Sequence, residues 1–528
     1  MKAPKDRLHR VLVIGATPAG LAATNKLGEM GIPVVLVDSD PDLHGKLARE
    51  EWRLASGLTL NYALRPGLLR ILRNPRIRCV LPGEVKTLKH TPQGFSARIV
   101  HNPAFVDPER CTLCGLCARI CPVTSIGGLK PIQYNGRQSL PGRPVIDKRR
   151  QPLCQANCPL GVNVQGYMAL AKEGRYGEAL EVIRRDNVLP GICGRVCSHP
   201  CESACRRGEL DEPLAIRDIK RFLADYAPAD AEDAAAPALP TRPQKVAVVG
   251  SGPAGLAAAA DLARFGYPVT VFEKEESLGG LLRYGIGLHR LPREILDREI
   301  RYLQGLGIRF LTNHPVDPRN ELEKLREEFS AILLTTGVWT DRKLGVPGED
   351  LEGVSGCLEF LSRFHRGQAE DLGEHVAVIG DGNAAFDLAR GLARTGRTVT
   401  LLSWFPEEMI PADEEEIRGA REEGIRLVDR TQTIGFTGSN GRLQSLRCIR
   451  TQPGEPDAKG IPWPVPVPGA LPFDLSFDSA IVAIGQRGDR FLLGTEQPVG
   501  MTDAGYIAVD DLFRTNVPGV FAGGDVIR

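Results

Sequence analysis

The residues with the clearest chemical potential in this chain are its cysteines. The sequence contains 13 of them, most between positions 111 and 205. The candidate metal ligands are Cys111, Cys114, Cys117, Cys121, Cys154, Cys158, Cys193, Cys197, Cys201 and Cys205. Such a density, with no marker of secretion, favours metal or redox chemistry over an insert stapled by disulfides, which is the alternative. Thiolate ligands at these spacings predict iron–sulfur clusters, which transfer single electrons.

The first four cysteines follow the pattern C-x2-C-x2-C-x3-C-P, the spacing of bacterial ferredoxins. In two-cluster ferredoxins the fourth cysteine binds the other cluster, so a mirrored run should follow. Cys154 and Cys158 match the last two positions of that run, but Lys148 and Gln151 stand where its first two cysteines should be. The second run is therefore broken. We expect at least two [4Fe–4S] clusters, or about eight irons per chain.

A second chemical signature is a glycine-rich turn in the segment VAVVGSGPAGLAAAADLARFGYPVTVFEK. Gly250, Gly252 and Gly255 form the fingerprint, and Glu273 closes the next strand about twenty residues later. The glycines permit a tight turn and the close approach of a pyrophosphate to a helix N-terminus, while the acid accepts hydrogen bonds from a ribose. Strand, turn, helix and acid together predict a dinucleotide site. A glycine turn without a ligand is the alternative.

The same pattern recurs further along the chain, in HVAVIGDGNAAFDLARGLARTGRTVTLLSW. Gly380, Gly382 and Ala385 occupy the fingerprint positions here. Two such units, each alternating strand and helix, predict two parallel-sheet domains with one inserted in the other.

A third glycine turn lies near the amino terminus. The predicted elements are a strand at Val11–Ile14, a helix at Ala19–Met30 and a strand at Val34–Val37. Gly15, Gly20 and Asp38 are the candidate nucleotide contacts, but Thr17 replaces the middle glycine, and its β-branched side chain would crowd a pyrophosphate. Two interpretations of this turn are open: it binds a nucleotide or flavin, or it is a structural remnant. The incomplete sheet leaves an edge that we expect a partner or the flavin domain to cover.

Three further segments, SLGGLLRYGIGLHRLPREIL, TTGVWTDRKLGVPGED and TNVPGVFAGGD, carry a family resemblance. With the cysteine segments PLCQANCPLGVNVQGYMAL and NVLPGICGRVCSHPCESACRRGE, they make about 150–528 resemble the glutamate synthase small subunit and dihydropyrimidine dehydrogenase. About 1–150 resembles the flavin subunit of heterodisulfide reductase. In that subunit a ferredoxin module interrupts the flavin domain.

The resemblance implies FAD at the first fingerprint and NAD(P)H at the second, placed for hydride transfer without a catalytic acid or base from the protein. Further implied FAD contacts are Pro253, Ala254, Lys274, Gly280, Leu281, Thr336, Gly337, Gly524 and Asp525. Further implied nicotinamide nucleotide contacts are Asn383, Ser403 and Gly485. Asp525 would hydrogen-bond a ribityl hydroxyl, and a merely solvated side chain is the alternative. Relatives continue with Gly-Pro and a helix after this aspartate, so we expect a fragment, a flavin edge completed by another chain, or an open edge.

The predicted fold class is α/β, with two Rossmann-like domains of the pyridine nucleotide-disulfide oxidoreductase type. The predicted domains are a partial Rossmann-like domain at 1–105, a ferredoxin-like cluster segment at 106–148, a helical iron–sulfur domain at 149–226, a linker at 227–243, an FAD-binding domain at 244–345 with 481–528, and an NAD(P)-binding domain at 346–480. The helices expected in the iron–sulfur domain are Val164–Lys172, Tyr176–Arg185 and Leu214–Asp225.

These features predict an oxidoreductase subunit that moves electrons between NAD(P)H, FAD and [4Fe–4S] clusters, to or from a partner redox protein in a larger complex. One alternative is a glutamate synthase small subunit. Another is a scaffold subunit of a redox complex, whose clusters only conduct electrons and whose nucleotide site is vestigial. The net charge of +1 predicts no nucleic-acid partner. Without an apolar run of 18 residues or more, we expect a soluble cytoplasmic protein with no transmembrane segment.

The choice of nucleotide depends on the end of the predicted strand Thr398–Leu402. Relatives usually carry two arginines there, which bind the 2′-phosphate of NADPH. Here Ser403, Trp404 and Phe405 follow the strand, and neither an arginine nor an acid is among them. We therefore expect NADH to bind at least as well as NADPH.

Overall fold

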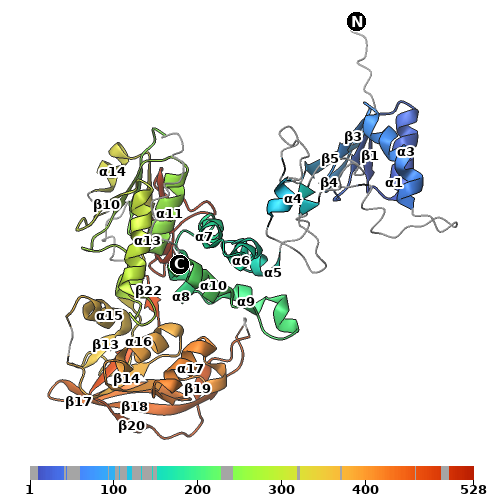
Figure 1. Cartoon of the computed structure of the whole chain (residues 1–528). Coiled ribbons are helices and arrows are strands. Elements are labelled where there is room, and N and C mark those ends of the chain that lie inside the picture. Colours follow the sequence, from blue (N-terminus) through green and yellow to red (C-terminus); the bar gives the residue numbers. More distant parts are fainter. Residues whose placement is uncertain are drawn as a thin grey trace. The chain divides into compact units, whose positions relative to one another are not determined.

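The computed structural model describes residues 10–40, 43, 60–92, 94–101, 106, 116–121, 132–133, 145–146, 152–226, 242–317, 321–368, 371–457, 460–488 and 499–527. The predicted ligands Cys111 and Cys114 lie outside these residues. The chain divides into two compact units, 1–156 with 165–175, and 157–164 with 176–528. Each unit is described by itself (Figure 1).

The first unit contains a small parallel sheet. Its strands are β1 (Val11–Ile14), β2 (Val34–Val37) and β3 (Ile77–Val80), in the order β1-β2-β3. Helices α1 (Pro18–Glu29) and α3 (Leu60–Arg73) contribute Leu21, Leu68 and Ile71 to a core with Leu36. A hairpin of β4 (Gly83–Thr91) and β5 (Gly94–His101) follows. The remaining elements are α4 (Leu116–Ile120), β6 (Ile132–Gln133), β7 (Val145–Ile146), α5 (Leu153–Ala156) and most of α6 (Val164–Lys172).

The second unit begins with short helices that carry four of the predicted cysteine ligands. They are α7 (Tyr176–Arg184), α8 (Pro190–Val196), α9 (Pro200–Ser203) and α10 (Ile216–Tyr226), with a 3-10 turn η2 (Arg206–Glu209). The predicted helices agree with α6, α7 and α10 to within two residues. Where α7 meets α10, the rings of Phe222 and Tyr226 stack, and the Tyr176 ring meets both of them edge to face.

The first fingerprint lies in a five-stranded parallel sheet with the order β10-β9-β8-β11-β23. The strands are β8 (Val246–Val249), β9 (Val269–Phe272), β10 (Arg309–Leu311), β11 (Ala331–Leu334) and β23 (Val520–Ala522). Helices α11 (Pro253–Arg264) and α13 (Arg293–Gly305) bury one face of the sheet, with the short α12 (Leu281–Tyr284) beside them. Helix α14 (Leu322–Glu328) and the segment 499–527 bury the other face.

The second fingerprint lies in another five-stranded parallel sheet, with the order β13-β21-β14-β15-β16. The strands are β13 (Val354–Gly356), β14 (His375–Ile379), β15 (Thr398–Leu402), β16 (Arg426–Val428) and β21 (Ser479–Val482). Helices α15 (Cys357–His365), α16 (Asn383–Ala393) and α17 (Glu414–Glu422) cover one face. The other face packs on an antiparallel sheet of β17 (Thr431–Ser439), β18 (Arg442–Pro453), β19 (Pro464–Pro466) and β20 (Phe473–Ser476).

The predicted domain boundary at 480/481 falls inside β21, which belongs to the second of these sheets. The chain crosses between the two domains at a two-stranded ribbon of β12 (Thr340–Asp341) and β22 (Gln486–Arg487). The boundary is therefore a few residues later than predicted, because β21 pairs with β13 and β14 before the chain returns.

A buried carboxylate joins the cysteine-bearing helices to the first of these domains. Glu299 of α13 is 2% exposed, and its Oε1 accepts a hydrogen bond of 2.8 Å from the backbone N of Gly191, at the start of α8. Burial raises the pKa of Glu299 to about 7, although the nearby Arg184 opposes this rise. The second carboxylate oxygen has no hydrogen-bond partner among the described residues.

The raised pKa of Glu299 predicts that the wild type and a Glu299→Gln variant differ in stability by an amount that depends on pH. Its folded pKa of about 7 exceeds the ordinary value of 4.5. The folded state therefore keeps a proton that the unfolded chain releases, and stability declines as pH rises from about 4.5 to 7. Glu299→Gln should match the wild type near pH 4.5 and exceed its stability by up to about 3 kcal/mol at pH 8. Thermal midpoints of both proteins across this range measure the effect. Glu294→Gln, at an exposed position of the same helix, is the control. If Glu299→Gln exceeded the wild type in stability by the same amount at both pH values, the raised pKa of Glu299 would be contradicted.

Within the part of the chain that the structure describes, no helix is both long and apolar enough to cross a lipid bilayer.

Candidate functional site

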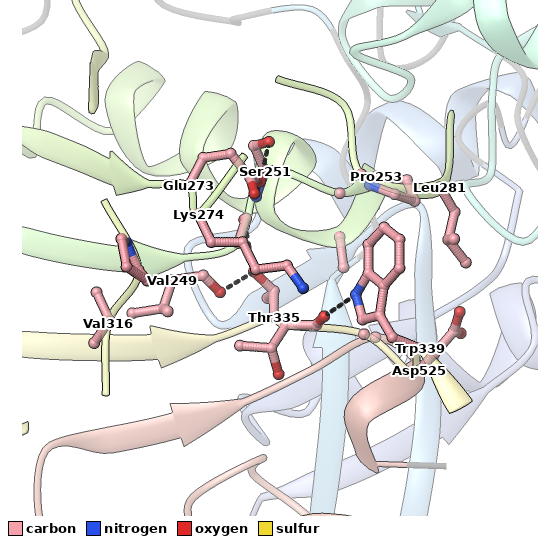
Figure 2. A pocket seen from close by; sticks show the side chains of 18 of the residues that line it. Val249, Ser251, Pro253, Glu273, Lys274, Leu281, Val316, Thr335, Trp339 and Asp525 are labelled. Atoms are coloured by element: carbon pink, nitrogen blue, oxygen red, sulfur yellow. Dashed lines mark hydrogen bonds between the residues drawn. The ribbon is translucent and has the colours of Figure 1, made fainter. Parts of the chain in front are cut away.

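A cavity of about 330 Å³ opens at the carboxyl ends of β8, β9 and β11 (Figure 2). In parallel sheets this edge is where ligands bind, because the loops that follow the strands meet there. The cavity is lined by Val249, Gly250, Ser251, Gly252, Pro253, Ala254, Glu273, Lys274, Gly280, Leu281, His314, Pro315, Val316, Thr335, Thr336, Gly337, Trp339, Gly524 and Asp525. Every predicted FAD contact except the buried Gly255 is among these residues.

The three fingerprint glycines of this cavity have different physical roles. Gly250 has a φ of +105°, and a Cβ there would lie 2.5 Å from the Thr335 carbonyl oxygen. A Cβ on Gly255 would collide with the carbonyl oxygen of Gly250. A Cβ on Gly252 would meet no atom within 4 Å, and its φ of −66° suits any residue. The chain itself requires the first and third glycines, whereas the space beside Gly252 contains no protein atom.

Glu273 and Ser251 hold the glycine turn in place. The Ser251 backbone N donates to Glu273 Oε2 at 3.0 Å, and the Ser251 hydroxyl donates to the same oxygen at 2.5 Å. That hydroxyl also accepts from the Gly279 N at 3.0 Å. Ser251 therefore connects the fingerprint to the segment that contains Gly280 and Leu281. As a result, predicted FAD contacts from both segments line the same cavity.

The segment that follows β11 adds one residue that sequence reasoning missed, Trp339. The Trp339 indole N donates to the Thr336 carbonyl oxygen at 2.9 Å, and Lys274 Nζ lies 4.7 Å from the centre of the Trp339 ring (Figure 2). The buried hydroxyl of Thr336 has no hydrogen-bond partner among the described residues. An open space at the glycine turn and an unpartnered hydroxyl fit a dinucleotide with both phosphate and ring-system contacts.

His314 to Val316 were also missed, although a signal was available. They follow β10, and the carboxyl end of any strand in this sheet opens toward the same edge. The exposed Asp525 begins a 3-10 turn, η5 (Asp525–Ile527), and borders the cavity.

The second fingerprint repeats the glycine geometry. Gly380 has a φ of +150°, and a Cβ there would collide with the Ala483 carbonyl oxygen, whereas a Cβ on Gly382 would meet no atom within 4 Å. Ala385 is fully buried. Asn383 exchanges hydrogen bonds of 3.0 and 2.8 Å with Asp413, which precedes α17. This unit therefore also keeps open space at its middle glycine.

Two other predicted contacts of this unit have partners within the protein. Ser403 is fully buried, and its hydroxyl contacts Asp381 Oδ2 at 3.3 Å and the backbone of Phe405. The Gly485 carbonyl oxygen accepts a 3.0 Å hydrogen bond from the Arg342 N beside the β12–β22 ribbon. Contacts of either residue with a nucleotide stay predictions.

The turn near the amino terminus differs from both of these units. The Thr17 hydroxyl caps α1 by accepting from the Gly20 N at 3.2 Å. Asp38 accepts from the backbone N atoms of Ala16 and Asp40, at 2.6 and 2.7 Å. A Cβ on Gly20 would collide with the Gly15 carbonyl oxygen. Gly20 is therefore required by the turn, and a backbone amide that would face a phosphate is occupied by Thr17.

Two cysteines of the second unit, Cys193 and Cys201, lie near a buried lysine. Cys158 and Cys197 are electrostatic neighbours of Cys201, and Cys197 is also a neighbour of Cys193. Burial raises the pKa of Cys201 to about 11 and also raises that of Cys193, while Lys220 of α10 opposes the rise at both thiols. Lys220 is 8% exposed and was missed by sequence reasoning. This cation fits a site that must hold several thiolates.

The other predicted ligands in the described part of the chain lie on separate elements. Cys117 is on α4 with Cys121 directly after it, Cys154 is on α5, and Cys205 precedes η2. None of the described cysteines forms a disulfide. Among the described residues, no three Cys, His, Asp or Glu side chains already converge as a metal-binding group. The donor set and Lys220 fit an iron–sulfur cluster, but its ligand geometry stays a prediction.

Comparisons with known proteins agree with these features. The model of the pyridine nucleotide-disulphide oxidoreductases matches residues 244–528. Two iron–sulfur models match as well, dihydropyrimidine dehydrogenase domain II at 148–232 and a 4Fe–4S binding domain at 104–126. The predicted resemblance to this group of iron–sulfur flavoproteins is thereby confirmed.

Three relatives illustrate the similarity. The chain is 39% identical to the NADP(+)-dependent formate dehydrogenase subunit beta of Moorella thermoacetica, over 71% of this chain and 56% of that protein. It is 36% identical to the NADPH-Fe(3+) oxidoreductase subunit beta of Geobacter sulfurreducens, over 72% of this chain and 60% of that protein. It is 32% identical to the glutamate synthase [NADPH] small chain of Escherichia coli, over 71% of this chain and 84% of that protein. The chain thus spans less than two thirds of the first two relatives.

Proposed function

Because this chain belongs to the pyridine nucleotide-disulphide oxidoreductase family, we propose that it passes electrons between a reduced nicotinamide nucleotide and a partner redox protein, as one subunit of a larger complex. Its cofactors are FAD and [4Fe–4S] clusters, and NAD(P)H is its substrate. FAD, when bound, supplies the exchange between two-electron hydride chemistry and one-electron chemistry. The protein supplies binding, orientation and electrostatics.

One contact carries this proposal. Helix α8, which contains Cys193, packs on α13 of the domain that holds the large cavity, with Gly191 N only 2.8 Å from Glu299 Oε1. The predicted ligand Cys193 and the predicted flavin cavity therefore belong to one compact unit, in which α8 and α13 are adjacent. Such an arrangement suits direct electron exchange between the two cofactors.

The residues of the cavity have distinct proposed roles. Gly252 leaves room for the pyrophosphate, and Glu273 holds the turn that presents it. Thr336 offers an unpartnered hydroxyl, and the apolar faces of Leu281 and Trp339 exclude water from the flavin ring. Lys220 offsets the negative charge of the cysteine thiolates across the neighbouring helices.

The partner is proposed from the relatives. Two of them are named as beta subunits, of a formate dehydrogenase and of an NADPH-Fe(3+) oxidoreductase. A glutamate synthase small subunit is the second candidate, because the chain covers 84% of the Escherichia coli small chain. The additional 4Fe–4S match at 104–126 favours the first proposal, in which more clusters extend the electron path.

Anaerobic addition of NADH or NADPH to the purified flavoprotein tests the proposal. Loss of the flavin absorbance near 450 nm, followed by loss of cluster absorbance near 410 nm, is the expected result. A flavin that stays oxidised with both nucleotides would favour the scaffold alternative.

A further inference from the structure

An acidic residue lies inside the second glycine fingerprint, between Gly380 and Gly382. Asp381 lies in the turn that joins β14 to α16, and its Oδ2 is 3.3 Å from the Ser403 hydroxyl. The Trp404 side chain also lies beside the Asp381 carboxylate. Both partners follow the carboxyl end of β15. The turn and the strand end are therefore joined by a carboxylate.

This strand end is the position at which nucleotide-binding folds distinguish two cofactors. An acid there accepts a hydrogen bond from the 2′-hydroxyl of NADH, and an arginine there accommodates the 2′-phosphate of NADPH. In this chain Ser403 is fully buried, with its hydroxyl bonded to Asp381 and the Phe405 backbone. The strand thus provides no acid of its own, but the glycine turn brings one to the same place.

Two arginines near this strand end, Arg430 and Arg421, have acidic partners, whereas the exposed Arg450 donates to the Thr431 hydroxyl at 2.9 Å. The backbone N of Arg430 donates to the Phe405 carbonyl oxygen at 3.0 Å, but its guanidinium pairs with Glu408 at 3.0 Å. Arg421 pairs with Glu407. A 2′-phosphate would meet the Asp381 carboxylate, while Arg430 and Arg421 are already paired with glutamates.

Arg397 cannot replace them. It precedes β15, at the opposite end of the strand, and donates to the Thr395 hydroxyl at 2.7 Å.

We propose that Asp381 is the residue that selects NADH over NADPH, by accepting the ribose 2′-hydroxyl of NADH and repelling the 2′-phosphate of NADPH. The inference rests on the proposed function, in which this unit binds a reduced nicotinamide nucleotide. The Trp404 side chain lies beside the same carboxylate. The relatives described above are named for NADP(+) or NADPH, so this chain would differ from them in its preferred nucleotide.

The test compares binding of oxidised nucleotides to the holoprotein with and without this charge. Burial raises the pKa of Asp381 to about 6, so the carboxyl is ionised at pH 8, where NAD⁺ and NADP⁺ are titrated by calorimetry. The wild type should bind NAD⁺ about tenfold more tightly or better, the effect expected for one hydrogen bond to a charged group. Asp381→Asn keeps the shape of the side chain and removes its charge. The preference for NAD⁺ over NADP⁺, measured as the ratio of their two affinities, should therefore fall to about threefold or less. Asp371→Asn, at an exposed acid of the same domain, should keep the wild-type ratio.

The outcomes separate the inference from the proposed function. A wild-type preference for NADP⁺, or an Asp381→Asn protein with an unchanged ratio, overturns the role of Asp381. If NAD⁺ binds as expected but NADH leaves the flavin oxidised, the proposed electron transfer fails and the selection by Asp381 stands. If neither nucleotide binds, both are overturned.

Discussion

Replacing Gly252 by valine is expected to abolish FAD binding while leaving the fold intact. A Cβ at this position meets no protein atom within 4 Å, and the backbone angles φ −66° and ψ 178° are allowed for valine. The new side chain would instead fill the space left for the pyrophosphate. Affinity for FAD should fall by about a hundredfold or more, which corresponds to roughly 3 kcal/mol. Flavin released by denaturation measures the content of the purified protein, and circular dichroism reports the fold.

Two other glycines provide matched controls for this change. Gly382→Val has the same open surroundings in the second fingerprint, so it should weaken nucleotide binding and retain FAD. Gly255→Ala places a Cβ against the Gly250 carbonyl oxygen, so it should destabilise the whole domain. Stoichiometric FAD in the Gly252→Val protein would refute the assignment of this cavity.

Replacing Cys201 by serine is expected to remove one cluster and to retain FAD. Cys201 is the thiol whose electrostatic neighbours include Cys158, Cys197 and the buried Lys220. A hydroxyl is a poor ligand for iron in place of a thiolate, so anaerobically purified protein should lose about four irons per chain. Iron analysis and absorbance near 410 nm measure the loss.

Cys448→Ser is the matched control for the cluster variant. Cys448 lies in β18 and is fully buried, with its Sγ 3.8 Å from the Leu446 carbonyl oxygen. This change should leave the iron content at the wild-type value. A Cys201→Ser protein with as much iron as the wild type would show that these cysteines are not cluster ligands.

Local sequence patterns determined much of the architecture. The strands Val11–Ile14, Val34–Val37 and Thr398–Leu402, and the helix Val164–Lys172, were predicted with the observed bounds. These elements depend on short apolar runs and glycine turns that are complete within a few residues. The fingerprint glycines were predicted for the same reason, since a turn and its acid are close in the sequence.

The tertiary structure alone decided which distant residues share a site. Glu299 contacts a backbone amide 108 residues away, and Lys220 lies near Cys193 and Cys201, which belong to two other helices. Trp339 reaches the predicted flavin cavity because parallel strands place their carboxyl ends together, whatever their separation in the chain. In the sequence, nothing distinguishes Asp381 from other acidic residues in loops. Only the pairing of β14 with β15 brings it to Ser403, since neighbouring parallel strands end at one edge of the sheet.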